Sequence, residues 1–244
     1  MHDDAAGDGR APPGDDAAPQ PAINLPGVVV ALIALFVALH VVRGLLDAAL
    51  ADDVLAVLAF IPLRYQSWAA FLHGDPGGWW AALAGPFTHL FLHGGWLHLT
   101  VNSVWMAAFG GPLARRIGAV RFVALALLSA AAGAFAFALA KWGAPAVLIG
   151  ASGAVSGMMG AMVRLIYAGR GDLATGIRRD FSTVRPLGVA ASLRLPGPRR
   201  FILLWMALNL VLGVLNVGAG GGIGRIAWEA HIGGFVAGFL LLRL

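Results

Sequence analysis

Long apolar stretches, separated by polar segments or by segments containing glycine and proline, dominate the chain. Several of them have about 20 residues, the length that an α-helix needs to cross ~30 Å of hydrocarbon at ~1.5 Å per residue. The pattern predicts an all-α membrane protein built as a six-transmembrane helical bundle. The expected spans are residues 27–47, 89–110, 119–140, 146–167, 201–218 and 226–243.

Three regions outside the spans have their own composition. Residues 1–25 contain little to bury, so we expect a disordered acidic cytoplasmic tail before a six-span domain at 26–244. Its acidic start also argues against a cleaved signal peptide. The loop at 48–88 carries several tryptophans, which favours a segment in the lipid headgroup region over an ordinary folded loop. The loop at 168–200 holds seven arginines, which serve as a topology signal or dock on anionic lipid.

Composition excludes a soluble globular protein, because only 12% of the residues are charged and 59% are hydrophobic. If the N-terminus is cytoplasmic, 13 of the 17 lysines and arginines fall on the cytoplasmic side. The positive-inside rule then places both termini in the cytoplasm. We expect a multi-pass protein of a bacterial inner (plasma) membrane, and we attribute the net charge of +5 to topology and not to nucleic acid.

Polar side chains at membrane depth are costly, so each one is a candidate functional group. The absence of cysteine excludes a thiolate nucleophile and Cys-ligated metal sites. The polar residues of the second, fourth and sixth expected spans are His89, His93, His98 and Asn102, then Ser152 and Ser156, then Glu229 and His231.

Ser152 and His231 lie six and five residues from the outer ends of their spans, which places both at ~8 to 9 Å depth if the spans are helical throughout. A hydroxyl and an imidazole at one depth are the minimum for nucleophilic catalysis. Small residues at helical spacing let two membrane helices approach closely, although such seams also occur without any chemistry. The glycines at this spacing are Gly150, Gly153, Gly157 and Gly160 in the fourth span and Gly234 and Gly238 in the sixth.

No carboxylate is placed to orient His231, because Glu229 points to a different side of the same helix. We therefore predict a Ser-His dyad in which packing positions the imidazole. The lack of a buried acid also argues against a proton-coupled transporter.

His98 and Asn102 are four residues apart and share one helix face. If that face meets Ser152, both side chains join backbone N–H groups in stabilising an oxyanion, at ~3 kcal/mol per donor. The alternative for each is a structural hydrogen bond between helices. His89, His93 and His98 suggest zinc ligands, but no H-E-x-x-H motif or nearby carboxylate accompanies them, so we expect no metal and no cofactor.

Three motifs follow one another on the second, fourth and sixth expected spans. They are Phe87-Thr88-His89-Leu90-Phe91-Leu92-His93-Gly94-Gly95-Trp96-Leu97-His98 with Asn102, then Gly150-Ala151-Ser152-Gly153, then Ala230-His231 with Gly234 and Gly238. With these motifs, residues 50–244 resemble the rhomboid intramembrane serine proteases.

The resemblance implies a six-span bundle whose fourth helix begins near Ser152, in a water-filled cavity open to the outer face. Ser152 is then the nucleophile and His231 the general base. Supporting positions implied by the resemblance are His98, Asn102, Gly150 and Ala151 at the oxyanion, His93 as a polar group of the cavity, and Gly220, Gly221 and Gly222 in a mobile cap over the site.

The family cleaves transmembrane helices near their outer ends, so the resemblance implies single-span membrane proteins as substrates. Ser156 departs from family members that place an aromatic residue there to support the histidine. Two alternatives are open: an inactive rhomboid-like protein that binds membrane helices, and an unrelated channel or transporter. The intact Ser152 and His231 argue against the first, and the lack of intramembrane acids argues against the second.

Overall fold

The computed structural model describes residues 25–74, 76–168, 181, 183–215 and 226–242. These residues are predominantly helical, as predicted, and no β-strand forms among them. The elements in chain order are α1 (Gly27–Leu45), α2 (Ala48–Leu58), the 3-10 helix η1 (Pro62–Tyr65), α3 (Trp68–His73), α4 (Gly78–Thr88), the 3-10 helix η2 (His89–Phe91), α5 (Trp96–Trp105), the π-helical turn η3 (Met106–Gly110), α6 (Gly111–Ile117), α7 (Ala119–Ala140), α8 (Ser152–Ile166), α10 (Val189–Arg194), α11 (Pro196–Val214) and α12 (Trp228–Leu241).

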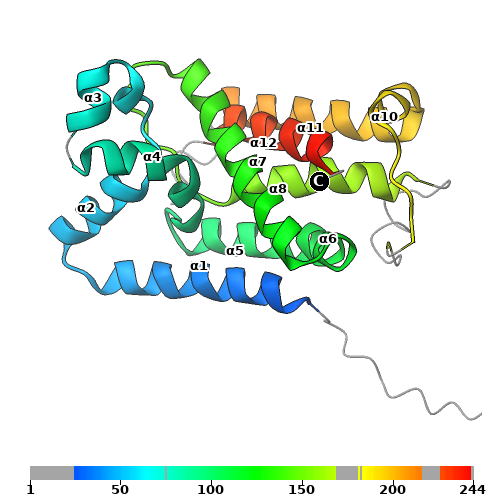
Figure 1. Cartoon of the computed structure of the whole chain (residues 1–244), viewed down its shortest axis with the longest axis horizontal. Coiled ribbons are helices and arrows are strands. Elements are labelled where there is room, and N and C mark those ends of the chain that lie inside the picture. Colours follow the sequence, from blue (N-terminus) through cyan, green and yellow to red (C-terminus); the bar gives the residue numbers. More distant parts are fainter. Residues whose placement is uncertain (1–24, 75, 169–180, 182, 216–225, 243–244) are drawn as a thin grey trace, which may run out of the picture.

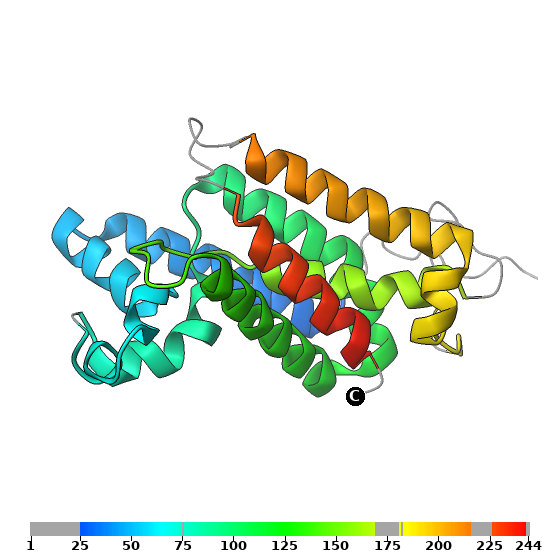
Figure 2. The ribbon, with the colours of Figure 1, turned by 90° about the horizontal axis from the view of Figure 1, so that it is seen from above.

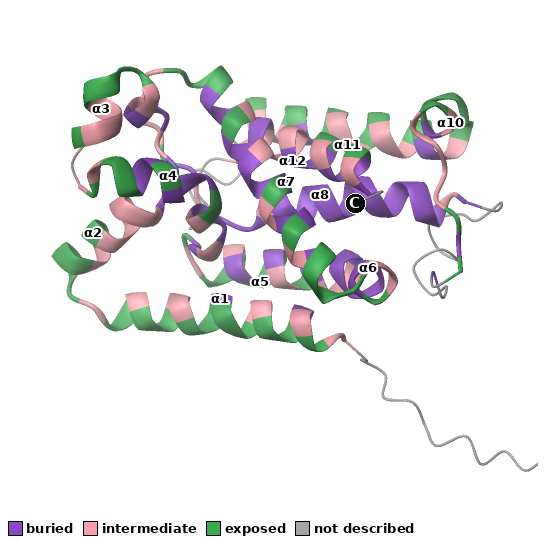
Figure 3. Cartoon of the chain, viewed as in Figure 1, coloured by how far each residue is buried: buried purple, intermediate pink, exposed green. Residues whose placement is uncertain are grey.

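Helix α8 runs through the middle of the molecule, with the other long helices around it (Figure 1). Every residue of α8 after Ser152 is buried, which Figure 3 shows as a nearly continuous purple helix. Helix α12 lies between α7 and α11 (Figure 2) and packs against α8 along its length. Helices α1 and α11 present large exposed apolar side chains at the periphery, as expected of helices that face lipid.

Three of the described helices, α1, α7 and α11, are long and apolar enough to cross a membrane. Helices α5, η3 and α6 follow one another without a break over residues 96–117. Helices α8 and α12 have 15 and 14 residues, about 21 to 22 Å at ~1.5 Å per residue, and so are shorter than ~30 Å of hydrocarbon. The six-span count stays a prediction.

The second expected span, 89–110, is misplaced. Residues 92–95 are not helical, because the Gly94-Gly95 pair disfavours a helix before α5 begins at Trp96. At the other end the helix continues through η3 into α6, and Pro112 lies in the turn directly after η3. The continuous helix therefore covers 96–117.

The fourth expected span, 146–167, begins too early. Residues 144–151 are not helical, and Leu148 instead pairs with Phe60 through two backbone hydrogen bonds of 2.9 and 3.1 Å. Since this segment is not a helix, the helical rise cannot give the depth of Ser152, and the premise of that estimate is wrong. The start of α8 at Ser152 agrees with what the resemblance implied.

The 48–88 region, which comprises α2, η1, α3 and α4, is folded around a buried arginine. The Arg64 guanidinium donates to the carbonyl oxygens of Ala56 (2.7 Å), Ala59 (3.2 Å) and Pro76 (2.9 Å). Tyr65 donates its hydroxyl to Ala82 O at 2.5 Å, and burial raises the pKa of Tyr65 to about 12. These bonds join the short helices into one unit.

The tryptophans of the 48–88 region remain on its surface. Trp68 is 73% exposed, and Trp79 and Trp80 are each more than half exposed. Exposed indole rings on a folded unit fit the expected position at the headgroup level, and the unit also has the internal structure of an ordinary folded loop.

Arg164, counted above among the cytoplasmic topology charges, is buried at the end of α8. Its Nε donates to Leu187 O at 2.8 Å and its Nη1 to Phe239 O at 2.7 Å. Arg164 therefore joins α8 to α12 and to the segment before α10, and it is not a solvated loop charge.

Several predicted features lie outside the described residues. These are residues 1–24 of the expected tail, residues 169–180 and 182 of the arginine-rich loop at 168–200, which hold three of its seven arginines, and the expected cap residues Gly220, Gly221 and Gly222.

Candidate active site

Three helices that carry predicted site residues start at the same end of the molecule. Helices α5, α8 and α12 all begin on the side where α2, α3 and α4 lie (Figure 1). His98 is in the first turn of α5, Ser152 is the first residue of α8, and His231 is in the first turn of α12. The fold thus gathers the expected groups at one end of the bundle.

Ser152 is the one residue of α8 that is not buried. The first N–H groups of a helix have no partner within it and carry the positive end of the helix dipole. Ala151 precedes the helix as its cap residue and is fully buried. A partly exposed serine therefore stands at the electropositive end of the central helix.

Glycines bring α8 and α12 into backbone contact. A Cβ at Gly238 would overlap the carbonyl oxygen of Gly157, and one at Gly234 would overlap that of Gly153. These four residues form what we call the glycine interface. The predicted glycine seam is confirmed for them and for Gly160, which meets Phe235 of α12, but not for Gly150, which precedes α8 and lies against His98. An ideal Cβ on Gly153, next to Ser152, would lie 3.6 Å from the carbonyl oxygen of Ala230, next to His231.

Within the described part of the chain, no hydrogen bond joins the side chains of Ser152 and His231. The contact between their neighbours nevertheless holds the two residues on facing turns of α8 and α12.

His98 and Asn102 lie against the turn that leads into α8. An ideal Cβ on Gly150 would lie 2.7 Å from the His98 ring and 3.9 Å from Asn102 Nδ2. Gly150 also has φ +110°, a conformation that side chains rarely adopt, so both space and backbone require glycine here. Gly94 N donates to His98 Nδ1 at 3.3 Å, and Asn102 Nδ2 donates to His98 O at 2.9 Å. The helix face that carries His98 and Asn102 therefore does contact the turn that precedes Ser152.

His89 has a structural position beside the same turn. Its Nδ1 donates to Gly85 O at 2.9 Å, and its own carbonyl oxygen accepts from Gly150 N at 2.9 Å. The Gly150 N–H is therefore occupied, so Gly150 shapes the turn and offers no free donor. Among the described residues, no group of three His, Asp or Glu is arranged to hold a metal ion.

His93 is 1% exposed, and neither ring nitrogen has a hydrogen-bond partner. Its ring packs edge-on against His98 with centroids 5.2 Å apart and contacts Phe36 at the same distance. Arg43 of α1 donates to His93 O at 3.0 Å. His93 is thus buried against His98, and its role as a polar group of an active-site cavity stays a prediction.

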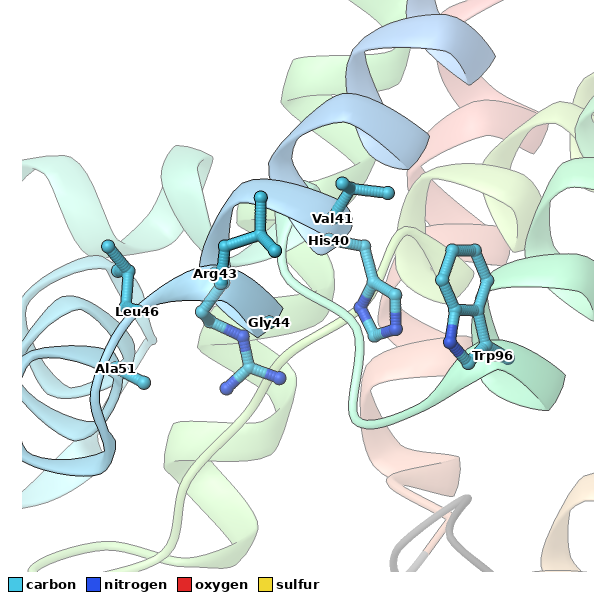
Figure 4. Close-up of a pocket in the computed structure, with 8 residues that line it drawn as sticks. His40, Val41, Arg43, Gly44, Leu46, Ala51 and Trp96 are labelled. Carbon is cyan, nitrogen blue, oxygen red and sulfur yellow. The ribbon is translucent and has the colours of Figure 1, made fainter.

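A cavity of about 520 Å³ opens at the end of α1, next to the start of α5. Arg43, His40 and Trp96 are among the residues that line it, and Figure 4 shows His40 facing the Trp96 indole. The two rings meet edge-on with centroids 4.7 Å apart. Arg43 borders this cavity while its guanidinium holds the backbone of His93.

The imidazole of His231 has a hydrogen-bond partner that the sequence analysis missed. Its Nδ1 lies 2.6 Å from Oδ1 of Asn209 on α11. The expectation that packing alone positions His231 is therefore wrong. The sequence did contain a signal for this partner: an amide at membrane depth is costly, so Asn209 is a candidate functional group for the same reason as Asn102.

Glu229 is buried and paired with Lys141 at 3.3 Å, across the ends of α12 and α7, so the expectation that the chain buries no acid is wrong. Glu229 and His231 therefore point to different sides of α12, as expected for residues two positions apart on a helix. The ion pair ties the start of α12 to α7.

Comparison with known proteins identifies the family of this chain. The sequence model of the Rhomboid domain matches residues 76–244, which is more than half of the chain. The chain belongs to the rhomboid family. With its apolar helices, this rhomboid-family chain is an integral membrane protein.

Three relatives of this rhomboid domain come from Arabidopsis thaliana. RHOMBOID-like protein 5 is 32% identical over 152 residues, which are 62% of this chain and 40% of the relative. RHOMBOID-like protein 4 is 32% identical over 151 residues, 62% of this chain and 31% of the relative. RHOMBOID-like protein 1 is 30% identical over 155 residues, 64% of this chain and 32% of the relative. The matched region thus spans less than half of each relative.

Proposed function

We propose that this rhomboid-family protein is an intramembrane serine protease that cleaves single-span membrane proteins near the outer end of their helix. One observation carries the proposal: Ser152 is the one residue of the central helix that is not buried, and it stands on the turn that faces His231 of α12. Family membership supports the same reaction class.

In the proposed reaction, His231 takes the proton of Ser152 Oγ while that oxygen attacks the scissile carbonyl. The oxyanion that forms accepts hydrogen bonds from His98, Asn102 and the first backbone N–H groups of α8. His231 then gives the proton to the leaving amine as the C–N bond breaks. Water repeats the sequence on the acyl-enzyme and releases Ser152.

We further propose that both termini are cytoplasmic. Removing the buried Arg164 from the count leaves 12 of the other 16 basic residues on that side, so the charge bias persists. The expected bacterial inner membrane stays a prediction, and the relatives above come from a plant.

The test is cleavage of a panel of labelled single-span helices by purified protein in liposomes. Ser152→Ala should abolish cleavage, while Ser156→Ala, one turn further on the same helix, should retain it. A folded wild-type protein that binds these helices without cutting any of them would favour the inactive, helix-binding alternative. Cleavage that survives in Ser152→Ala would exclude Ser152 as the nucleophile.

A further inference from the structure

Most residues of helix α11 are exposed or only partly buried, but Asn209 is buried. Only Pro198 and Asn209 are buried among its residues, and Asn209 is 4% exposed. Its chain neighbours Leu208 and Leu210 are 47% and 44% exposed. Apolar residues of α11 such as Trp205 and Met206 are partly buried against the core, but beyond its first turn the helix fully buries one side chain, and that side chain is an amide. In these surroundings a polar group needs a partner.

Two hydrogen bonds define the orientation of this amide. Asn209 Nδ2 donates to Trp205 O, one turn earlier on α11, at 2.8 Å. Asn209 Oδ1 is thereby directed at His231 Nδ1, 2.6 Å away. A carbonyl-type oxygen only accepts, so the hydrogen in this contact belongs to the imidazole Nδ1.

A neutral imidazole with its proton on Nδ1 has its lone pair on Nε2. That is the form a general base needs, because Nε2 is the nitrogen that can accept the serine proton. The bond also fixes the rotation of the ring about its side chain. Asn209 thus sets both the tautomer and the orientation of the base.

No carboxylate competes for this role in the described structure. Glu229, the nearest acid along α12, is paired with Lys141 on α7. The other titratable or charged groups on the elements around His231 are His98 near the start of α5, Arg121 at the far end of α7, Arg164 at the far end of α8, and Arg199 and Arg200 at the far end of α11.

We propose that Asn209 is a positioning residue for His231, which makes the catalytic unit Ser152, His231 and Asn209, with a neutral amide as the orienting group. The proposal rests on the protease function proposed above. It assigns to α11 an indirect part in catalysis, through one side chain that orients the base.

The kinetic test compares Asn209→Ala, Asn209→Asp and the control Leu208→Ala, a neighbour that faces outward. Asn209→Ala should lower kcat by about 10- to 100-fold with little change in KM, because general-base catalysis contributes about 10²- to 10⁴-fold. Asn209→Asp should recover activity and move the acidic limb of the kcat/KM profile to higher pH, since a carboxylate stabilises the imidazolium. Equal kcat in Asn209→Ala and Leu208→Ala would overturn the proposal.

A second measurement is independent of proteolysis. In ¹⁵N-histidine NMR of the full chain, with the His231 signals assigned by their loss in His231→Ala, wild-type His231 should be neutral with Nδ1 protonated. Asn209→Ala should shift this population toward the Nε2-protonated form. A wild-type signal from the Nε2-protonated form would refute the role of Asn209 even if the protein is an active protease. If the wild type cleaves nothing but shows the expected tautomer, the protease function fails and the Asn209–His231 contact stands.

Discussion

The glycine interface and the 48–88 region are stabilised in opposite ways. In the glycine interface, the absence of side chains lets the backbones of α8 and α12 touch, as at Gly157 and Gly238. In the 48–88 region, one long side chain, Arg64, fills the space between short helices and satisfies three carbonyl groups.

The difference follows from what surrounds each region. Between apolar helices in lipid, burial of apolar surface gives little net gain, so close van der Waals contact has to supply the attraction. The turns and helix ends of the 48–88 region instead leave carbonyl groups that need donors, and a buried guanidinium supplies several at once. The glycine interface therefore depends on the lack of side chains at its glycines, and the 48–88 region depends on the one guanidinium group of Arg64.

The largest expected effect comes from adding volume to the glycine interface. Gly238→Val should destabilise the protein by about 3 kcal/mol or more, because its side chain would overlap the Gly157 carbonyl and force α8 and α12 apart. Thermal unfolding in detergent measures this. The control is Gly44→Ala on α1, where an added Cβ meets no atom within 4 Å. This variant should leave the stability of the protein unchanged or slightly raise it. Similar unfolding of the two variants would show that the interface is not tightly packed.

Removal of the arginine should have an intermediate and local effect. Arg64→Ala should cost about 2 to 3 kcal/mol in the 48–88 region, because buried carbonyl groups lose a charged donor. Hydrogen exchange should rise in α2 and α4 while α8 stays protected. Arg64→Lys should rescue only part of the loss, since an ammonium lacks the planar fork. Increased exchange in α8 of the alanine variant would instead show that the two regions unfold together.

The smallest effect concerns Tyr65. Tyr65→Phe removes the hydrogen bond to Ala82 O and should cost about 1 kcal/mol. Because burial raises the pKa of Tyr65 to about 12 from 10.0, the unfolded chain ionises first. The contribution is therefore complete below pH 10 and is lost as the pH rises to about 12. A wild-type protein and a Tyr65→Phe variant with the same loss of stability over this pH window would contradict the assignment.

Much of the site could be predicted because it depends on spacing. The glycines that join α8 to α12 recur at helical intervals, so their contact, and with it the juxtaposition of the Ser152 and His231 turns, can be read from the sequence. The shared face of His98 and Asn102 follows from the same geometry. The roles of these residues in catalysis stay predictions.

The features that were missed depend on contacts between distant segments. Asn209 is a single amide in an apolar helix, and no periodicity marks which side of α11 meets α12. Arg64 and Arg164 count as topology charges in a sequence, yet each bonds to carbonyl groups of other segments in the fold. The start of α8 was placed too early because Leu148 pairs with Phe60, 88 positions away in the chain, instead of continuing a helix.

The π-helical turn η3 between α5 and α6 has a consequence for how this site can change. Such a turn contains one residue more than an α-helical turn, so it offsets the helix face before it from the face after it. Deleting one residue within 106–110 would rotate His98 and Asn102 by about 100° relative to α6, at 3.6 residues per turn. The wall of the site that faces Gly150 is thus adjustable by a single-codon insertion or deletion. After such a change α6 would keep its packing against α7. The continuous helix over 96–117 can therefore vary at the end that carries His98 while its other end stays fixed.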